Sequence, residues 1–556
     1  MKKEYSLSPG AALSSLLAST REAARLQREE LFHILRENRG TAYGRRFAFG
    51  TIGSVEEYQD QVPFSHHSDY QPYVEKLLAG ETCQLTAQEP VYYAITSGST
   101  GTPKYVPVTK EDMLVHLYGI HAVVRDSLRA YYPQATEAEL FGKIFYVGEF
   151  AKTHLPGGQM CGIRSGSLYQ WLEQEDAFDT TPFCVPKEVL FPEDLEDLTY
   201  VRLRFALAQP DIRLIHSVFL HRVVRLMDDL RENWDRILWD IAHGEVDASL
   251  PLSPHWREKV RRWLPPDPHR AQQLREMALD QHPEDMIRRL WPQVRCIIGV
   301  GGRNFPVYSQ AMACYGPSVP IHHFIYGASE GFLSVAVEVG VPDAYLLLPK
   351  AGFFEFLPVP AQPGQRPLTM EQLEVGKQYE LIFTNHSGLY RYCMQDVLEV
   401  VAFRGQAPVI RFCYRINQVL NVADEKLNTE QLQEALRLFR QQAGFDHAPF
   451  CAQEDFSVRP GRYLVYLETP PLPQAGALLD RCLCQASLGC LGCRSMGEIA
   501  PVCVRFLPPG TFLRYEETLA KQGRTLSQYK PIQLLEREDA RQFFAAAAAG
   551  YEEETT

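Results

Sequence analysis

The chain has 556 residues, of which 45% are hydrophobic and 22% charged, so it is a globular protein of roughly two to four domains and not a disordered or repetitive one. It carries 56 Lys and Arg against 68 Asp and Glu, a formal net charge of -12, and it has no basic block, so nucleic acid is not an expected partner. No run of about 18 uncharged apolar residues occurs, so we expect no membrane-spanning helix. The N-terminus lacks the pattern of a signal peptide, and we expect a cytoplasmic protein.

Helical and strand-like patterns alternate over the first 400 residues. Helical spacing of apolar residues occurs at 13–35, 111–130 and 199–244. Strands that run into small-residue loops are predicted at 91–95, 294–302 and 321–331. Further strands are predicted at 344–348, 352–357, 379–384 and 397–403. This alternation predicts an α/β fold with strand-rich additions.

The pattern changes near residue 430. An amphipathic helix begins there with Thr429 as the expected N-cap, and strands are predicted at 463–468 and 502–506 with a helix between them. The last dozen residues resemble a frayed helix and an acidic tail. We therefore predict a large domain at 1–428 and a small α+β domain at 429–556.

Thirteen scattered cysteines indicate reduced thiols. Four of them, Cys482, Cys484, Cys490 and Cys493, are close enough in sequence to raise the alternatives of a zinc site or a redox motif. Their spacing is tighter than that of a zinc ribbon, and free cysteines are commonly buried. We therefore expect them to be ordinary core residues and predict no metal there.

The segment Thr96–Lys104 (TSGSTGTPK) has the composition of a phosphate-binding loop. Packed Gly, Ser and Thr residues let backbone N–H groups approach phosphate oxygens, and Lys104 adds a positive charge. The spacing is not that of a Walker A loop, and a surface turn rich in small residues is the alternative. The predicted phosphate-binding residues are Ser97, Gly98, Ser99, Thr100 and Gly101.

Three further segments have the composition of a nucleotide site. In Tyr326–Gly331 (YGASEG) an aromatic ring can cover a base, and the carboxylate of Glu330 can hold Mg²⁺. In Gly388–Val397 (GLYRYCMQDV) Asp396 can accept ribose hydroxyls, although a salt-bridged Arg–Asp pair on a turn is the alternative. Lys530, in the last segment, would by itself be an ordinary surface lysine.

Together, in this order and at these separations, the four segments resemble the motifs of the adenylate-forming superfamily, which includes acyl-CoA ligases and luciferases. The chain is more closely similar to the auxin-responsive acyl acid–amido synthetases, the Gretchen Hagen family, from about residue 50 to 535. Family-like stretches include PGGQMCGIRSGSLY (156–169), RLWPQVRCIIGVGG (289–302) and PGTFLRYEE (509–517). The resemblance implies the adenylate-forming fold, with a large N-terminal domain and a small mobile C-terminal domain.

The resemblance also implies an ATP-dependent reaction in two steps. A small carboxylic acid first forms an acyl-adenylate and pyrophosphate, and an amine, expected to be an amino acid, then displaces AMP to give an amide. The alternatives are an acyl-CoA ligase that shares the first step, or a catalytically idle relative that acts as a binding protein. We expect a monomer that uses Mg²⁺.

By the same resemblance, Lys530, Lys104 and Glu330 are the expected catalytic residues, with Glu330 as the metal ligand. The expected nucleotide site adds Ser167 and Asp396 to the phosphate loop and to the adenine-binding residues Tyr326, Gly327, Ala328 and Ser329. The acyl pocket is expected at Leu117, Tyr118, Ile120 and Tyr169, whose character favours a small hydrophobic or aryl acid. The amine is expected near Thr511, Leu513, Arg514 and Tyr515.

The third motif departs from the family pattern G-L-Y-R-Y-R-x-G-D at two positions. Cys393 stands where the family has a second Arg, and Gln395 stands where it has Gly. The loss of a cation and of a flexible residue beside Asp396 is the reason for keeping the idle-relative alternative.

Overall fold

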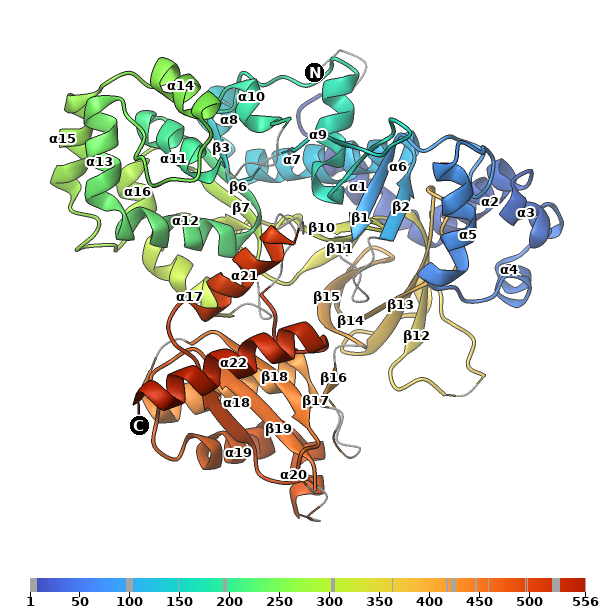
Figure 1. Cartoon of the computed structure of the whole chain (residues 1–556). Helices are drawn as coiled ribbons and strands as arrows, with labels where there is room; N and C mark the ends of the chain where they lie inside the picture. Colours follow the sequence, from blue (N-terminus) through green and yellow to red (C-terminus); the bar gives the residue numbers. More distant parts are fainter. Residues whose placement is uncertain are drawn as a thin grey trace. The chain divides into compact units, whose positions relative to one another are not determined.

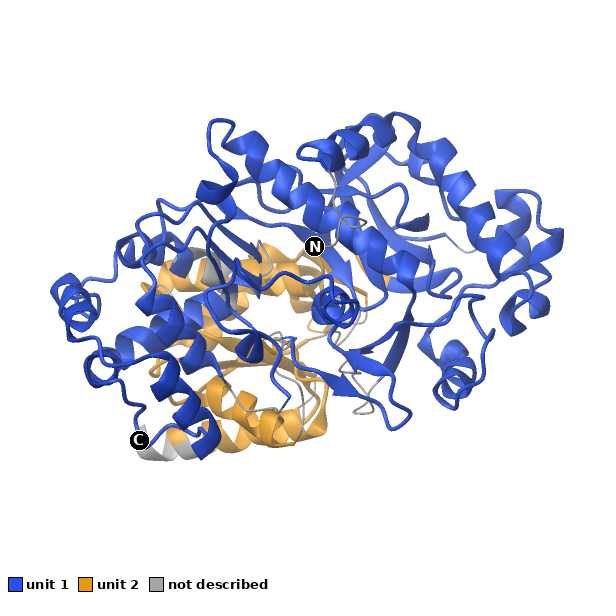
Figure 2. Cartoon of the chain, turned by 90° about the horizontal axis from the view of Figure 1, so that it is seen from above, with its two compact units in different colours: residues 1–96, 104–394, 398–412 blue, residues 97–103, 395–397, 413–556 orange. Residues whose placement is uncertain are grey.

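The structure is a computed structural model that describes residues 8–96, 104–148, 150–193, 198–301, 306–362, 364–416, 419–420, 422, 427–445, 448–458, 460–495, 497, 499–522 and 531–555. The chain forms two compact units, coloured separately in Figure 2. Among the described residues, unit 1 comprises those up to 394 together with 398–412, and unit 2 comprises 395–397 and those from 413 onward. The domain boundary at 428/429 stays a prediction.

The largest sheet has seven strands in the order β12-β13-β14-β15-β11-β10-β9 (Figure 1). They are β9 (Ile325–Ala328), β10 (Gly331–Val335), β11 (Tyr345–Leu347), β12 (Gly352–Pro358), β13 (Gln378–Asn385), β14 (Tyr392–Arg404) and β15 (Ala407–Arg415). Their alternating and continuous apolar runs pack in one core that includes Leu381, Phe383 and Leu398. The predicted strands in this region are confirmed.

Unit 1 contains two further sheets of four strands each. In the parallel sheet β3 (Ile144–Tyr146), β6 (Leu214–Phe219), β7 (Cys296–Val300) and β8 (Ile321–His322) follow one another. The other sheet has the order β2-β1-β5-β4, with β1 (Tyr92–Thr96), β2 (Lys104–Val108), β4 (Thr153–His154) and β5 (Met160–Gly162).

Helices surround these sheets. The N-terminal ones are α1 (Ala11–Ser19), α2 (Ala23–Asn38), α3 (Ala42–Arg46), α4 (Val55–Gln61) and α5 (His67–Leu78). A second set is α6 (Lys110–Val115), α7 (Ala122–Tyr131), α8 (Glu137–Phe141), α9 (Arg164–Gln174) and α10 (Lys187–Leu190). A third set is α11 (Thr199–Ala208), α12 (Leu220–Glu232), α13 (Trp234–His243), α14 (Pro254–Trp263), α15 (Pro268–Met277), α16 (Met286–Leu290) and α17 (Pro306–Tyr315).

The sequence prediction of continuous helix over 199–244 is wrong, because Leu214–Phe219 is strand β6. A six-residue apolar run between helices cannot be told from a helical turn by periodicity alone, and here pairing with β3 and β7 on both sides makes it a strand. The predicted helix at 111–130 is confirmed, but it contains a π-helical turn at His116–His121 between α6 and α7.

Unit 2 is an α+β assembly. Its sheet has the order β18-β19-β20, formed by Phe450–Asp455, Arg462–Leu467 and Cys503–Phe506. The helices are α18 (Thr429–Ala443), α19 (Ala475–Ala486), α20 (Leu488–Ser495), α21 (Thr511–Lys521) and α22 (Glu538–Thr555), and a short pair β16 (Val419–Leu420) and β17 (Leu427–Asn428) precedes them. Cys482, Cys490 and Cys493 are buried in its core, as ordinary core residues would be.

Two details of unit 2 correct the sequence analysis. The N-cap of α18 is Asn428, not Thr429, because the side chains of Asn428 and Gln431 each accept a hydrogen bond from the other residue's backbone N–H. The last residues continue the alanine-rich helix α22 to Thr555 instead of forming a tail. None of the described helices is long and apolar enough to cross a membrane.

Candidate nucleotide and acyl-substrate site

Several of the predicted site residues lie outside the residues that the structure describes. They are Ser97, Gly98, Ser99, Thr100, Gly101 and Lys530. Their roles stay predictions. Lys104 is described: it is half-buried at the start of β2, where it pairs in register with Thr96 of β1.

The predicted adenine-binding segment forms the hairpin of β9 and β10, with Ser329 and Glu330 at its turn. Gly327 is exposed, and a Cβ atom at this position would lie 2.7 Å from Cδ1 of Phe332, so the close packing of the hairpin requires glycine. Ala328 and Ser329 are partly exposed beside it. The Tyr326 ring is buried and stacks on Phe412 at 5.8 Å. The hairpin therefore presents small residues at its surface, and the stacked rings of Tyr326 and Phe412 support it from below.

The carboxylate of Glu330 is fixed by a residue of the third motif. The hydroxyl of Tyr392 donates a hydrogen bond to Oε1 of Glu330 at 3.0 Å, and the side-chain amide of Asn385 donates to the Glu330 carbonyl oxygen at 2.7 Å. Two motifs that are 62 residues apart in sequence thus meet at one half-buried carboxylate. Tyr392 was not among the predicted site residues, although it lies inside the third motif.

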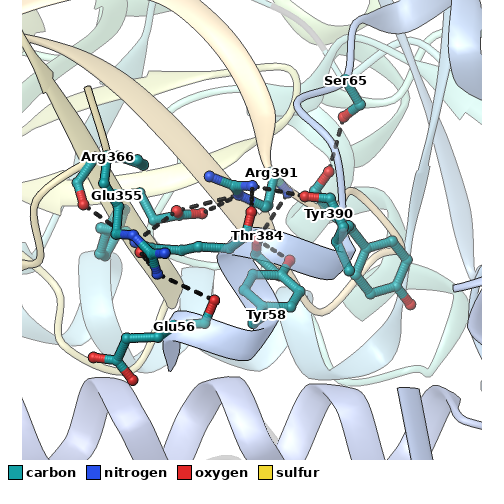
Figure 3. Close-up of polar contacts among 12 residues, drawn as sticks. Glu56, Tyr58, Ser65, Glu355, Arg366, Thr384, Tyr390 and Arg391 are labelled. Carbon is teal, nitrogen blue, oxygen red and sulfur yellow. Dashed lines mark hydrogen bonds and ion pairs between the residues drawn. The ribbon is translucent and has the colours of Figure 1, made fainter. Parts of the chain in front are cut away.

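The connection between β13 and β14, residues 386–391, is held by buried polar contacts (Figure 3). The side chain of Arg391 is 4% exposed and contacts both oxygens of Glu355, at 3.2 and 3.1 Å. Its Nη1 also donates to the carbonyl oxygens of Gln59 at 2.5 Å and Val62 at 2.6 Å. Tyr390 is fully buried and donates its hydroxyl to the carbonyl oxygen of Leu85.

Asp396 is paired with a different arginine from the one that the sequence alternative implied. Its side chain is 4% exposed, and Nε of Arg415 donates to its Oδ1 at 2.7 Å, whereas Arg391 pairs with Glu355. Arg415 lies at the end of β15 and is partly exposed, a site residue that the sequence analysis missed because only the strand pairing brings it to Asp396. The ribose role of Asp396 stays a prediction.

Ser167 lies in a buried polar network on α9. Its hydroxyl donates to the carbonyl oxygen of Arg164 at 2.7 Å and accepts from Nη1 of Arg164 at 2.6 Å. Arg164 in turn pairs with Asp112 at 2.9 Å, and both side chains are almost completely buried. The hydroxyl of Ser167 also lies 3.6 Å from Sδ of Met113 on α6, so its described contacts are with buried side chains and backbone, and its nucleotide role stays a prediction.

The predicted acyl-pocket residues gather around the π-helical turn. Leu117, Tyr118 and Ile120 belong to this turn, and Leu117 and Ile120 are buried. Tyr169 stacks on Phe150 at 4.2 Å, and its hydroxyl lies 3.3 Å from Nδ1 of His121. A π-helical turn inside an α-helix frequently marks a functional site.

Three histidines line this aromatic region. The rings of His116 and His121 are 4.8 Å apart, and that of His216 is 6.5 Å from His121. Burial lowers the pKa of His121 to about 4 and that of His216 to about 3, so both rings are neutral at neutral pH. Among the described residues, Nδ1 of His116 and Nε2 of His121 have no hydrogen-bond partner. Sequence periodicity could not reveal this cluster, because His216 comes from strand β6.

The acceptor-side residues lie on α21 in unit 2. Thr511 and Tyr515 are buried, and Tyr515 packs against Phe544 at 5.1 Å. Leu513 is 44% exposed. Arg514 donates to the hydroxyl of Thr511 at 2.7 Å. Leu513 and Arg514 are thus the exposed members of this set, and the role of the helix in amine binding stays a prediction.

Comparison with known proteins places the whole chain in one family. The GH3 family N-terminal domain matches residues 12–321, the central domain matches 345–415, and the C-terminal domain matches 430–539. The jasmonoyl–L-amino acid synthetase GH3.5 of Oryza sativa subsp. japonica is 26% identical, over 95% of this chain and 97% of the relative. The indole-3-acetic acid-amido synthetase GH3.10 of Arabidopsis thaliana is 27% identical, over 91% and 92%.

A solved structure shows the same fold. The AtGH3.15 acyl acid amido synthetase in complex with 2,4-DB superposes with a TM-score of 0.83 at 23% identity, and the alignment covers 98% of this chain and 97% of that one. The α/β fold that the sequence predicted is therefore confirmed, and the predicted class, acyl acid amido synthetase, is the class of these relatives. Since the N-terminal domain alone matches more than half of the residues, the chain belongs to the GH3 family.

Proposed function

We propose that this protein is an ATP-dependent ligase that adenylates a small hydrophobic or aryl carboxylic acid and transfers the acyl group to an amino acid. The observation that carries the proposal is the hydrogen bond between Tyr392 and Glu330, because it joins two of the four predicted nucleotide motifs at one carboxylate. We further expect a cytoplasmic monomer.

The chemistry needs activation of the carboxylic acid, because a carboxylate does not react with an amine. In the first step a carboxylate oxygen attacks the α-phosphorus of ATP, and the bond to pyrophosphate breaks. In the second step the amine nitrogen attacks the acyl carbon, the bond to AMP breaks, and the nitrogen loses a proton. Negative charge grows at the α-phosphate in the first step, so preorganised cations lower its barrier. We assign this role to Lys104 and Lys530.

The residues around Glu330 fit a Mg²⁺ ion. A half-buried carboxylate is the oxygen ligand that Mg²⁺ takes, and the hydrogen bond from Tyr392 to Oε1 fixes its orientation. When bound, Mg²⁺ neutralises phosphate charge. Arg415 orients the carboxylate of Asp396, to which we assign the ribose hydroxyls, and we assign adenine to the exposed hairpin at Gly327.

The residues that we assign to the acyl pocket indicate which class of carboxylic acid it would bind. The π-helical turn and Tyr169 offer apolar and aromatic walls, and the neutral rings of His116 and His121 offer nitrogen atoms that can hydrogen-bond a polar group of the acid. This combination favours an apolar or aryl acid with one polar substituent besides its carboxylate.

The test is carboxylate-dependent exchange of labelled pyrophosphate into ATP, with a panel of aryl and aliphatic acids, followed by mass spectrometry of products formed with amino acids or CoA. We expect exchange with some of the acids and an amide product. A thioester made with CoA would support the acyl-CoA ligase alternative. No exchange with any acid, in protein that melts cooperatively, would favour the idle relative.

Variants test the individual roles. Lys530→Ala should lower the exchange rate on the order of 10²–10³-fold, as does removal of one preorganised electrostatic group. Asp396→Asn should weaken ATP binding measured by calorimetry, and Glu330→Gln should abolish the dependence of exchange on Mg²⁺. Lys521→Ala is the control for Lys530→Ala, because it removes a lysine at the end of α21 that has no proposed role. Equal rates for both lysine variants would remove Lys530 from the mechanism.

A further inference from the structure

A cluster of four potential metal ligands lies in unit 1 and shares none of the residues assigned above. Glu30 and His33 are one turn apart on α2, Glu111 is in the first turn of α6, and His386 is the first residue of the connection between β13 and β14. One ligand atom from each of the four lies within 4.8 Å of every other. Three separate segments thus supply two imidazoles and two carboxylates to one point.

Neighbouring members of the cluster already contact one another through His–Glu pairs, and an ion would take one nitrogen from each histidine and one oxygen from each glutamate. Nε2 of His33 lies 3.1 Å from Oε1 of Glu111, and Nε2 of His386 lies 3.3 Å from Oε1 of Glu30. Nδ1 of His386 lies 3.6 Å from Oε2 of Glu111. Ligand atoms about 2.0–2.1 Å from a tetrahedral zinc ion are about 3.4 Å from one another. One atom from each of the four residues lies within 4.8 Å of the others, so the side chains would draw together to this spacing around an ion.

The electrostatics of the cluster favour a cation. The side chain of His386 is 2% exposed and that of Glu30 is 15% exposed, while those of His33 and Glu111 are about one-third exposed. Two carboxylates thus lie beside two imidazoles in a partly buried position. His33, Glu111 and His386 also line a recess of the surface, through which an ion can enter.

We propose that Glu30, His33, Glu111 and His386 bind one divalent transition-metal ion, with Zn²⁺ as the preferred occupant. Two imidazole nitrogens and two carboxylate oxygens form a ligand set that zinc accepts, whereas Mg²⁺ and Ca²⁺ prefer oxygen ligands alone. Four protein ligands complete a tetrahedral shell, so the site is structural and not catalytic. The ion would join α2, α6 and the connection that carries Arg391.

The proposed role of the metal ion follows from the position of His386 along the chain. His386 begins the connection between β13 and β14, and Arg391, which pairs with Glu355, ends it. A metal at the first residue and an ion pair at the last would fix both ends of the segment that leads to Tyr392. Loss of the ion should therefore loosen this connection without removing any residue assigned to the nucleotide.

The experiment uses the full chain, stripped with a chelator and titrated with Zn²⁺, Co²⁺, Mg²⁺ or Ca²⁺. We expect one Zn²⁺ per chain by calorimetry, a rise of the thermal midpoint with Zn²⁺, and no comparable rise with Mg²⁺ or Ca²⁺. Co²⁺ should show tetrahedral absorption bands without a thiolate charge-transfer band, which distinguishes this site from zinc bound by the free cysteines. Glu30→Gln should weaken the affinity for Zn²⁺ at least 10-fold.

Glu29→Gln is the matched control, because Glu29 is the exposed neighbour on the same helix and the substitution removes the same charge. His33→Gln, at a partly exposed position, serves as the second variant should Glu30→Gln fail to fold. Equal Zn²⁺ affinity in Glu29→Gln and Glu30→Gln would overturn the proposal. So would the absence of stoichiometric zinc binding, which would leave the four residues as a cluster held by hydrogen bonds alone.

Discussion

Replacement of Arg391 by Met would test what holds the third motif in place. The guanidinium is almost fully buried, pairs with a Glu355 carboxylate that is 1% exposed, and donates to two backbone carbonyl oxygens (Figure 3). Met fills most of the volume of the side chain but supplies neither the charge nor the donors. The substitution leaves Glu355 as an uncompensated buried anion.

The expected cost is large. Removal of one partner of a buried ion pair destabilises a protein by about 3–5 kcal/mol, and each buried carbonyl left without a donor adds about 1 kcal/mol or more. We expect the free energy of unfolding to fall by about 5 kcal/mol in Arg391→Met. All six tryptophans lie between residues 171 and 291, in unit 1, so tryptophan fluorescence in a urea titration reports on the unit that contains this pair.

Two further variants make the reasoning refutable. Arg366→Met is the control, because Arg366 pairs with Asp60 at 2.7 Å but both side chains are exposed, and its loss should cost less than about 1 kcal/mol. The double variant Arg391→Met with Glu355→Leu removes the buried charge as well and should recover at least about 2 kcal/mol. If Arg391→Met and Arg366→Met unfold at the same urea concentration, the pair does not hold the motif.

Three other predictions concern the motif and the histidines. Gln395 has a φ of 59°, a conformation that glycine adopts freely and that strains other residues. Calorimetry should therefore show that Gln395→Gly is more stable than Gln395→Ala by about 1 kcal/mol. Equal stability of the two variants would exclude backbone strain at this position. Tyr392→Phe should lower the exchange rate about 10-fold with little change of the thermal midpoint, because the hydrogen bond to Glu330 is lost while the ring is kept. A normal rate would show that this bond is dispensable. Burial lowers the pKa values of His121 and His216 below 6.5, so acidification from pH 6.5 toward 4 protonates the unfolded chain first and should lower the thermal midpoint. His216→Phe should reduce this acid sensitivity, whereas His154→Phe, at an exposed position, should not.

The sequence predicted five strands of the seven-stranded sheet, because they are apolar runs bounded by turn residues, and it missed β10 and β15. Residues 379–384, for example, lie within β13, and 352–357 lie within β12. The order of the strands in the sheet could not be predicted in this way. The pairing of Glu355 with Arg391 follows from the order of β12, β13 and β14, and nothing in the local pattern reveals which strands are neighbours.

The candidate site was predictable to the same extent. Tyr326–Gly331 and Gly388–Val397 were recognisable because small residues, aromatics and acids at fixed spacing are local features. Which residues support the acids was not recognisable, since Tyr392 reaches Glu330 and Arg415 reaches Asp396 only through the folded sheet. The metal cluster was not predicted from the sequence for the same reason, because its four ligands come from segments up to 356 residues apart.

The two departures from the family pattern leave the backbone of the third motif intact. Gln395 adopts the left-handed conformation that glycine would adopt, and its carbonyl oxygen accepts a hydrogen bond from the backbone N–H of Ile416. Cys393 is buried, its backbone N–H donates to Ser65, and burial raises the pKa of its thiol to about 12, so it is a neutral core side chain. Since Asp396 follows in an ion pair with Arg415, neither substitution displaces the acid that the nucleotide would need. The idle-relative alternative therefore has no support from the geometry of this motif.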